Sequence, residues 1–148
     1  MEYREARLGR MFCAAFEHGE DLSEGLRQLA AEQQLEAGLV IVLGALAEAK
    51  MVLGPRELVV PPTPMWHRFA DGREIIAVGT LFREGAGYCL HLHGAAGRNE
   101  STLTGCLRRE CRVFLTAEAV IFELYGSGAR KIKDEAGFSL LGFGDAED

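Results

Sequence analysis

The segment Gly38-Leu-Val-Ile-Val-Leu-Gly-Ala45 is an uninterrupted apolar run with a glycine at or near each end. Such runs are typical of strands covered on both faces, whereas a strand with one face in water alternates between apolar and polar residues. We therefore expect residues 38–45 to form the central strand of the core. A second extended segment, residues 48–53, follows after too few residues for a crossover helix, which favours antiparallel pairing of neighbouring strands.

One amphipathic helix is expected before this run. Asp21 is a suitable N-cap, and Glu24, three residues later, could reach back to close a capping box. Apolar residues recur at helical spacing from Leu22 to Ala30, with polar residues mostly on the other side. The helix should therefore begin near Asp21, continue to about Gln34 and lie on a sheet.

The rest of the chain predicts strands joined by short turns. Asp71-Gly72 suits a tight turn between two paired strands, residues 66–69 and 74–82. Six or seven strands with one main helix predict an α+β domain, in which the helix packs on a mixed, largely antiparallel sheet. The other expected strands are residues 8–16, 88–94, 112–115 and 119–125.

Length and composition indicate one folded domain over residues 1–148, with an acidic tail from about residue 140 to 148. The 148 residues are 48% hydrophobic and 26% charged, which is typical of a chain that buries one core. The N-terminus lacks the apolar run of a signal peptide, and no stretch approaches the roughly 20 apolar residues of a membrane span. We expect a cytoplasmic protein with no membrane partner, whose four cysteines are reduced.

The segment Tyr88-Cys-Leu-His-Leu-His-Gly94 carries the candidate site. In a strand, successive side chains point to opposite faces, so Cys89, His91 and His93 share one face. The other face is apolar. Two imidazoles at positions i and i+2 of a strand can hold one metal ion and leave positions for a third ligand and water.

Several short motifs, in order along the chain, resemble the PPC (plants-and-prokaryotes-conserved) domain. The resemblance implies an α+β fold, a homotrimer and a stand-alone bacterial domain of unknown biochemical function that is often described as DNA-binding. Plant members bind DNA through an AT-hook, and this chain contains no Arg-Gly-Arg-Pro core. The motifs are Phe16-Glu-His-Gly-Glu-Asp-Leu22, Gly44-Ala45, Glu74, Leu90-His-Leu-His93, Gly105-x-Leu107, Glu118 and Arg130-x-x-x-Asp134 with Gly137 and Leu140.

The same resemblance implies a third metal ligand. Some bacterial members resemble metal binders through the two strand histidines and a histidine in a Gly-Gly-His-Leu segment. Here that segment is Thr104-Gly-Cys-Leu107, which places Cys106 at the third position. Imidazole and thiolate both suit zinc, and three protein ligands with an open fourth position form a catalytic type of site.

Two other interpretations of His91, His93 and Cys106 stay open. The histidines could be neutral, hydrogen-bonded and metal-free at a subunit interface, with Cys106 a small buried hydrophobic residue. Alternatively, Cys106 and a histidine could form the nucleophile and base of a Cys-His hydrolase. No reaction follows from these residues alone.

Further residues are candidates for supporting roles. A carboxylate can orient a ligating imidazole through its second nitrogen, and His67, beside Trp66, could line the same cleft. A polar loop after His93 could meet an anionic ligand. For each of these residues a solvated surface position is the alternative. The candidate carboxylates are Glu74, Glu118 and Glu123, and the candidate anion-binding residues are Arg98, Asn99, Ser101 and Arg108.

The basic residues suggest the alternative function, a DNA-associated regulatory protein in which the domain mediates oligomerisation. In a trimer these residues could form a basic ring. A net charge of −6 opposes general nucleic-acid binding. We therefore favour a homotrimer with a metal or small-molecule site. The basic residues are Arg98, Arg108, Arg109, Arg112, Arg130, Lys131 and Lys133.

Overall fold

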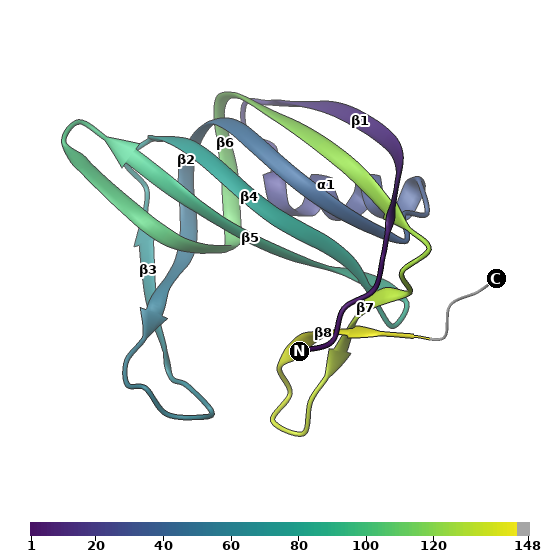
Figure 1. Cartoon of the computed structure of the whole chain (residues 1–148). Coiled ribbons are helices and arrows are strands. Elements are labelled where there is room, and N and C mark those ends of the chain that lie inside the picture. Colours follow the sequence, from purple (N-terminus) through teal and green to yellow (C-terminus); the bar gives the residue numbers. More distant parts are fainter. Residues whose placement is uncertain (145–148) are drawn as a thin grey trace.

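The apolar run at residues 38–45 lies within β2 (Ala37–Pro55), the strand on which the fold is built (Figure 1). The structure is a computed structural model that describes residues 1–144. Strand β2 pairs with β6 along one edge and with β4 and β3 along the other. The other elements are β1 (Arg7–Glu17), α1 (Leu22–Glu32), β3 (Pro64–Phe69), β4 (Arg73–Glu84), β5 (Gly87–Arg98), β6 (Ser101–Tyr125), β7 (Ala129–Lys133) and β8 (Ser139–Phe143).

Strand β2 contains both of the segments expected as neighbouring strands, residues 38–45 and 48–53, so their expected separation is wrong. The bend between them begins at Gly44, whose φ is 139°, and a Cβ there would lie 2.5 Å from the Ala117 Cα. The register against β6 then shifts several times before Met51. Bulges of this kind bend a strand without ending it.

Strand β6 closes the sheet on itself. Its first half pairs with β5 and the second half of β2, and its second half lies between β1 and the first half of β2. The expected separate strands 112–115 and 119–125 both belong to β6, which bends at Glu110 and Leu115, where φ is 54° and 63°. Every pairing among the strands of residues 1–144 is antiparallel, and the α+β fold class is confirmed.

The expected hairpin between residues 66–69 and 74–82 is wrong. Strand β3 pairs with the second half of β2, through Met51 and His67, and β4 pairs with its first half, through Leu46 and Arg73. The turn at Asp71-Gly72 thus connects two strands that lie end to end along one edge of β2. The Gly72 amide donates to the Ala47 carbonyl at 3.2 Å, which holds this turn to β2.

Helix α1 covers one face of the sheet through Leu22, Leu26 and Ala30, all fully buried. Asp21 is the N-cap, and its carboxylate accepts the Ser23 and Glu24 amides at 3.0 and 3.1 Å. The expected capping box is not formed, because the Glu24 carboxylate pairs with Arg27 at 2.8 Å. With 11 residues, α1 is the only helix among the described residues, and it is too short and too polar to cross a membrane.

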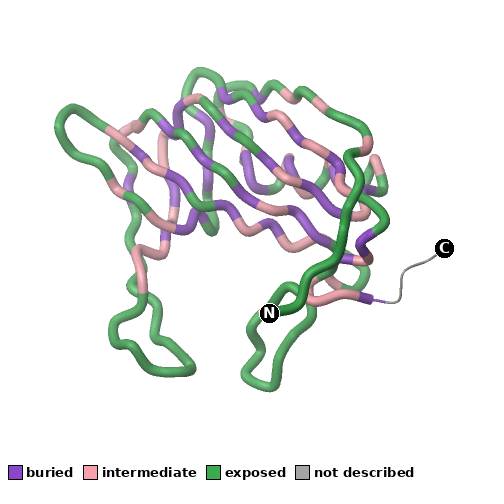
Figure 2. The backbone as a smooth tube through the Cα atoms, in the orientation of Figure 1, coloured by how far each residue is buried: buried purple, intermediate pink, exposed green. Residues whose placement is uncertain are grey.

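The face of the sheet opposite α1, here called the open face, is apolar but uncovered in the single chain (Figure 2). Ile41 and Leu43 are 36% and 51% exposed, and Ile76 and Val78 beside them are 57% and 50% exposed. The expectation that residues 38–45 are covered on both faces is therefore wrong for one chain. In the single chain these side chains form an exposed apolar surface.

The C-terminal residues form a second, two-stranded sheet of β7 and β8. Residues 140–143, expected in the acidic tail, are instead part of β8, because they pair with β7. Gly144 donates its amide to the Gly128 carbonyl at 2.8 Å, and residues 145–148 of that expected tail lie outside the described residues. The β7–β8 hairpin and the loop between β2 and β3 project from the same side of the main sheet (Figure 1).

Candidate metal centre

Strands β5 and β6 bring two imidazoles and a thiol together on the open face. His91 and His93 alternate with buried leucines on β5, and His93 is the register partner of Cys106 on β6. The Nε2 atoms of His91 and His93 are 3.0 Å apart. One ligand atom from each of His91, His93 and Cys106 lies within 4.8 Å of the other two. The three side chains singled out in the sequence therefore form one cluster.

The spacing of these atoms fits a small divalent ion. Tetrahedral zinc with ordinary bond lengths needs about 3.3 Å between two nitrogen ligands and about 3.6 Å between nitrogen and sulfur. The nitrogens are 3.0 Å apart, and the longest separation of 4.8 Å must shorten by roughly 1 Å. Three donors leave one tetrahedral position for another ligand. The donor spacing therefore lies within about 1 Å of that of a tetrahedral zinc site.

The protonation state of the histidines favours ligation. At 3.0 Å the two Nε2 atoms can form one hydrogen bond, in which one ring donates its N–H and the other ring accepts with an unprotonated nitrogen. Burial lowers the pKa of His91, and the charges of His93, Arg108 and Lys131 lower it further. His91 is therefore neutral near pH 7, with a lone pair that a metal ion can use.

Cys106 is 4% exposed, and burial raises the pKa of its thiol. The nearby Arg108 charge opposes this effect but is the smaller cause. An activated cysteine nucleophile requires the opposite shift, so the geometry does not favour the Cys-His hydrolase. A metal ion, in contrast, displaces the thiol proton directly, at a cost that decreases as the pH rises.

The three candidate carboxylates do not contact the imidazoles. Glu123 faces the α1 side of the sheet, where Arg10 binds it with Nε–Oε2 at 2.7 Å and lowers its pKa. Glu118 is separated from β5 by β2 and β4, which is about 14 Å at ordinary strand spacing. Glu74 lies four residues along β4 from Val78, the partner of His93, again roughly 13 Å away. Register, which the sequence does not reveal, decides all three positions.

The candidate anion-binding residues do not form one group. Arg98, Asn99 and Ser101 lie at the β5–β6 turn, where Arg98 is 3.5 Å from the Asp71 carboxylate. Arg108 lies seven residues further along β6, about 24 Å from Ser101. Only Arg108 adjoins the histidine cluster, because its charge acts on both His91 and Cys106.

Several other basic residues have partners within the chain. Arg112 donates to the Gly19 carbonyl at 2.6 Å, and the Arg109 guanidinium lies 5.9 Å from the Trp66 ring centre. The Lys131 ammonium lies 5.8 Å from the Phe82 ring centre. These residues are therefore dispersed among separate contacts in one chain.

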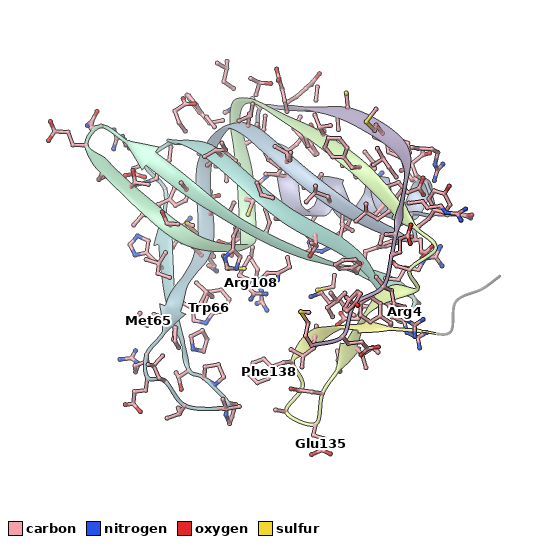
Figure 3. The ribbon with its side chains drawn as sticks, viewed as in Figure 1. Arg4, Met65, Trp66, Arg108, Glu135 and Phe138 are labelled. Atoms are coloured by element: carbon pink, nitrogen blue, oxygen red, sulfur yellow. The ribbon has the colours of Figure 1, made fainter. Side chains whose placement is uncertain are left out.

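A groove of about 930 Å³ leads to the cluster (Figure 3). His93 and Cys106 line it together with Trp66, Arg108 and Phe138. His67, a candidate for this cleft with a solvated position as the alternative, is exposed on β3, and its neighbour Trp66 lines the groove instead. Successive side chains on a strand point to opposite faces, so Trp66 and His67 of β3 cannot both face the groove. Nothing in the sequence around Phe138 predicts its place in the groove, because the β7–β8 hairpin brings it there from far along the chain.

Comparison with known proteins places the chain among others of its fold. The sequence model of the Plants and Prokaryotes Conserved (PCC) domain matches residues 3–125. No curated protein matches the chain.

Three solved structures share the fold at identities too low to show more than that. A metal-containing protein from Archaeoglobus fulgidus has a TM-score of 0.83 at 20% identity, over 95% of this chain and 99% of that one. A plant- and prokaryote-conserved protein from Pyrococcus horikoshii has a TM-score of 0.82 at 19% identity, over 96% and 97%. A "Putative DNA-binding protein" from Ralstonia eutropha JMP134 has a TM-score of 0.75 at 16% identity, over 89% and 90%.

Proposed function

The chain belongs to the Plants and Prokaryotes Conserved (PCC) domain family, and we propose that it is a self-associating protein whose functional centre is a zinc site formed by His91, His93 and Cys106. The observation that carries this proposal is the cluster itself, with three ligand atoms within 4.8 Å of one another. The name of the structurally similar metal-containing protein from Archaeoglobus fulgidus supports it.

The residues of the site have separate roles in this proposal. His91 supplies a neutral nitrogen from a half-buried position, and His93 supplies one at the exposed mouth of the groove. Cys106 supplies a thiolate once its proton has left. A bound zinc ion would act as a Lewis acid toward a small molecule in its fourth position. The groove beside His93 and Cys106 gives such a molecule a route to the site.

Self-association is proposed from the open face. One register row runs across five strand segments through Cys13, Val120, Ile41, Val78 and His93. Four of its five residues are apolar or weakly polar. Further exposed apolar side chains lie near the row on three of the strands that it crosses: Met11 on β1, Leu43 on β2 and Ile76 on β4. A second copy of the chain would cover this face, and the family resemblance gives the number of copies as three. The row continues from His93 to its register partner Cys106, so the proposed metal site would lie beside that interface.

The metal content of the purified protein tests the proposal. We expect about one zinc ion per chain by elemental mass spectrometry when no chelator is used, and a large loss in Cys106→Ser. Cys13→Ser is the matched control, because Cys13 is an exposed thiol outside the cluster. Absence of zinc from the native protein, together with no thermal stabilisation by added zinc, would refute the site, because a ligand that binds only the native state must stabilise it.

A further inference from the structure

The groove that reaches the proposed metal site has two apolar walls. One wall is formed by the end of β2, the following loop and β3, and it presents Trp66, which is 53% exposed. The other is formed by the β7–β8 hairpin and presents Phe138, which is 36% exposed. Figure 3 shows these two side chains on opposite sides of the space below the sheet, with Arg108 between them. The remaining apolar lining residues include Val52, Leu53, Pro62 and Pro64.

The charged residues of the groove indicate the sign of the ligand. Those that line it are Arg27, Glu84, Arg108 and Arg109. Arg27 is paired with Glu24 at 2.8 Å, the Glu84 carboxylate accepts the Ser139 hydroxyl, and Arg109 lies over the Trp66 ring. Within residues 1–144, Arg108 makes no hydrogen bond or ion pair through its guanidinium.

An unpaired guanidinium is well suited to bind one carboxylate. Its planar fork of N–H donors matches the two oxygens of a carboxylate, and such charge-assisted pairs are about twice as strong as neutral hydrogen bonds. A phosphate dianion fits less well, because Arg109, the other lining cation without an ion pair among the described residues, lies over the Trp66 ring, and Glu84 adds a negative charge nearby. The flat faces of Trp66 and Phe138 favour a planar apolar body.

We propose that the groove binds a small aromatic carboxylic acid, with its carboxylate on Arg108 and its ring between Trp66 and Phe138. This inference deepens the proposed function, because the groove would hold such a ligand beside His93 and Cys106. Any reaction of the ligand at that position rests on the proposed zinc site. The Arg108 charge also acts on both His91 and Cys106, which agrees with a position next to the cluster.

Trp66 provides the measurement, because it is the only tryptophan in the chain. Benzoate is titrated into zinc-loaded protein and into protein stripped with a chelator, and the tryptophan emission is followed. Benzamide, which has nearly the same shape without the charge, is the control ligand. Arg108→Gln is the test variant. Arg98→Gln is the matched control, because it makes the same change at the β5–β6 turn, away from the groove.

We expect saturable binding of benzoate that weakens about tenfold or more in Arg108→Gln and with benzamide, and is unchanged in Arg98→Gln. Equal affinity of benzoate for the native protein and Arg108→Gln, or equal affinity for benzamide, overturns the inference. Saturable, Arg108-dependent binding to stripped protein that takes up no zinc supports the groove while refuting the metal site. Normal zinc uptake without any benzoate binding refutes the groove alone.

Discussion

The affinity of the site for zinc should depend on pH through the thiol of Cys106. Burial raises the pKa of this thiol above its ordinary value of 9.0, and zinc must displace its proton. The pKa of His91 is lowered from its ordinary value of 6.5, so this ring binds without releasing a proton near neutral pH. Zinc binding should therefore release one proton between about pH 7 and 9.

This stoichiometry fixes the magnitude. One proton released per zinc ion raises the zinc association constant about tenfold per pH unit, or about 1.4 kcal/mol. The gain continues until the pH exceeds the pKa of Cys106 and then ceases. Once the pH falls below the lowered pKa of His91, the slope should become steeper, because this imidazolium must then also lose a proton.

Competition between the protein and a chromophoric chelator across this pH range measures the slope. Cobalt binding gives an independent check, through the thiolate-to-cobalt absorption band. Cys106→Ser should bind far more weakly and lose the slope, whereas Cys13→Ser should retain both affinity and slope. A native affinity that stays constant between about pH 7 and 9 would refute Cys106 as a ligand.

Three further changes test the rest of the structure. Val78→Lys puts a charge on the open face and should sediment as a monomer in analytical ultracentrifugation, whereas the native protein and Gln28→Lys, on the exposed side of α1, are expected to sediment as the proposed trimer. A Val78→Lys protein that sediments as a trimer would exclude this face as the interface. Gly79→Ala should weaken zinc binding at least severalfold, because the new Cβ would lie 2.4 Å from the His91 carbonyl oxygen. Gly97→Ala is the control, because the nearest atom to its Cβ would be 3.7 Å away. Equal zinc affinities of the two variants would contradict the role of Gly79. Leu26→Ala should lower the free energy of unfolding by about 2–5 kcal/mol in urea titrations, because Leu26 is fully buried, and a loss below about 1 kcal/mol would show that α1 packs loosely.

The site was predictable from the sequence where local geometry determines it. The two-residue spacing of His91 and His93 places them on one face of any strand, and the family resemblance supplied Cys106. The supporting carboxylates were not predictable. Whether Glu118 or Glu123 reaches a histidine depends on the register and on which strands lie between the glutamate and β5. Glu123 instead accepts a hydrogen bond from Arg10.

The fold class followed from the sequence, but the lengths of the strands did not. A change of direction at Gly44 looks the same in sequence whether the chain turns back or merely bends. The hairpin around Asp71-Gly72 failed for a related reason, because the local turn signal was correct while the partner of both strands was the distant β2. The apolar run at residues 38–45 predicts a strand that is covered on both faces. In one chain only the face toward α1 is covered, so the prediction would hold only in an assembly of chains.

The pairing of β1 with the end of β6 has a consequence for how the chain folds. Glu17 pairs with Thr116 and Leu8 with Leu124, so the first strand has no partner until the second half of β6 has been synthesised. The sheet is consequently dominated by contacts between residues far apart in sequence, and such topologies fold in milliseconds to seconds. During synthesis Met11 and Phe12 of the N-terminal strand therefore stay unpaired until β6 has been made, and only then can the sheet form completely.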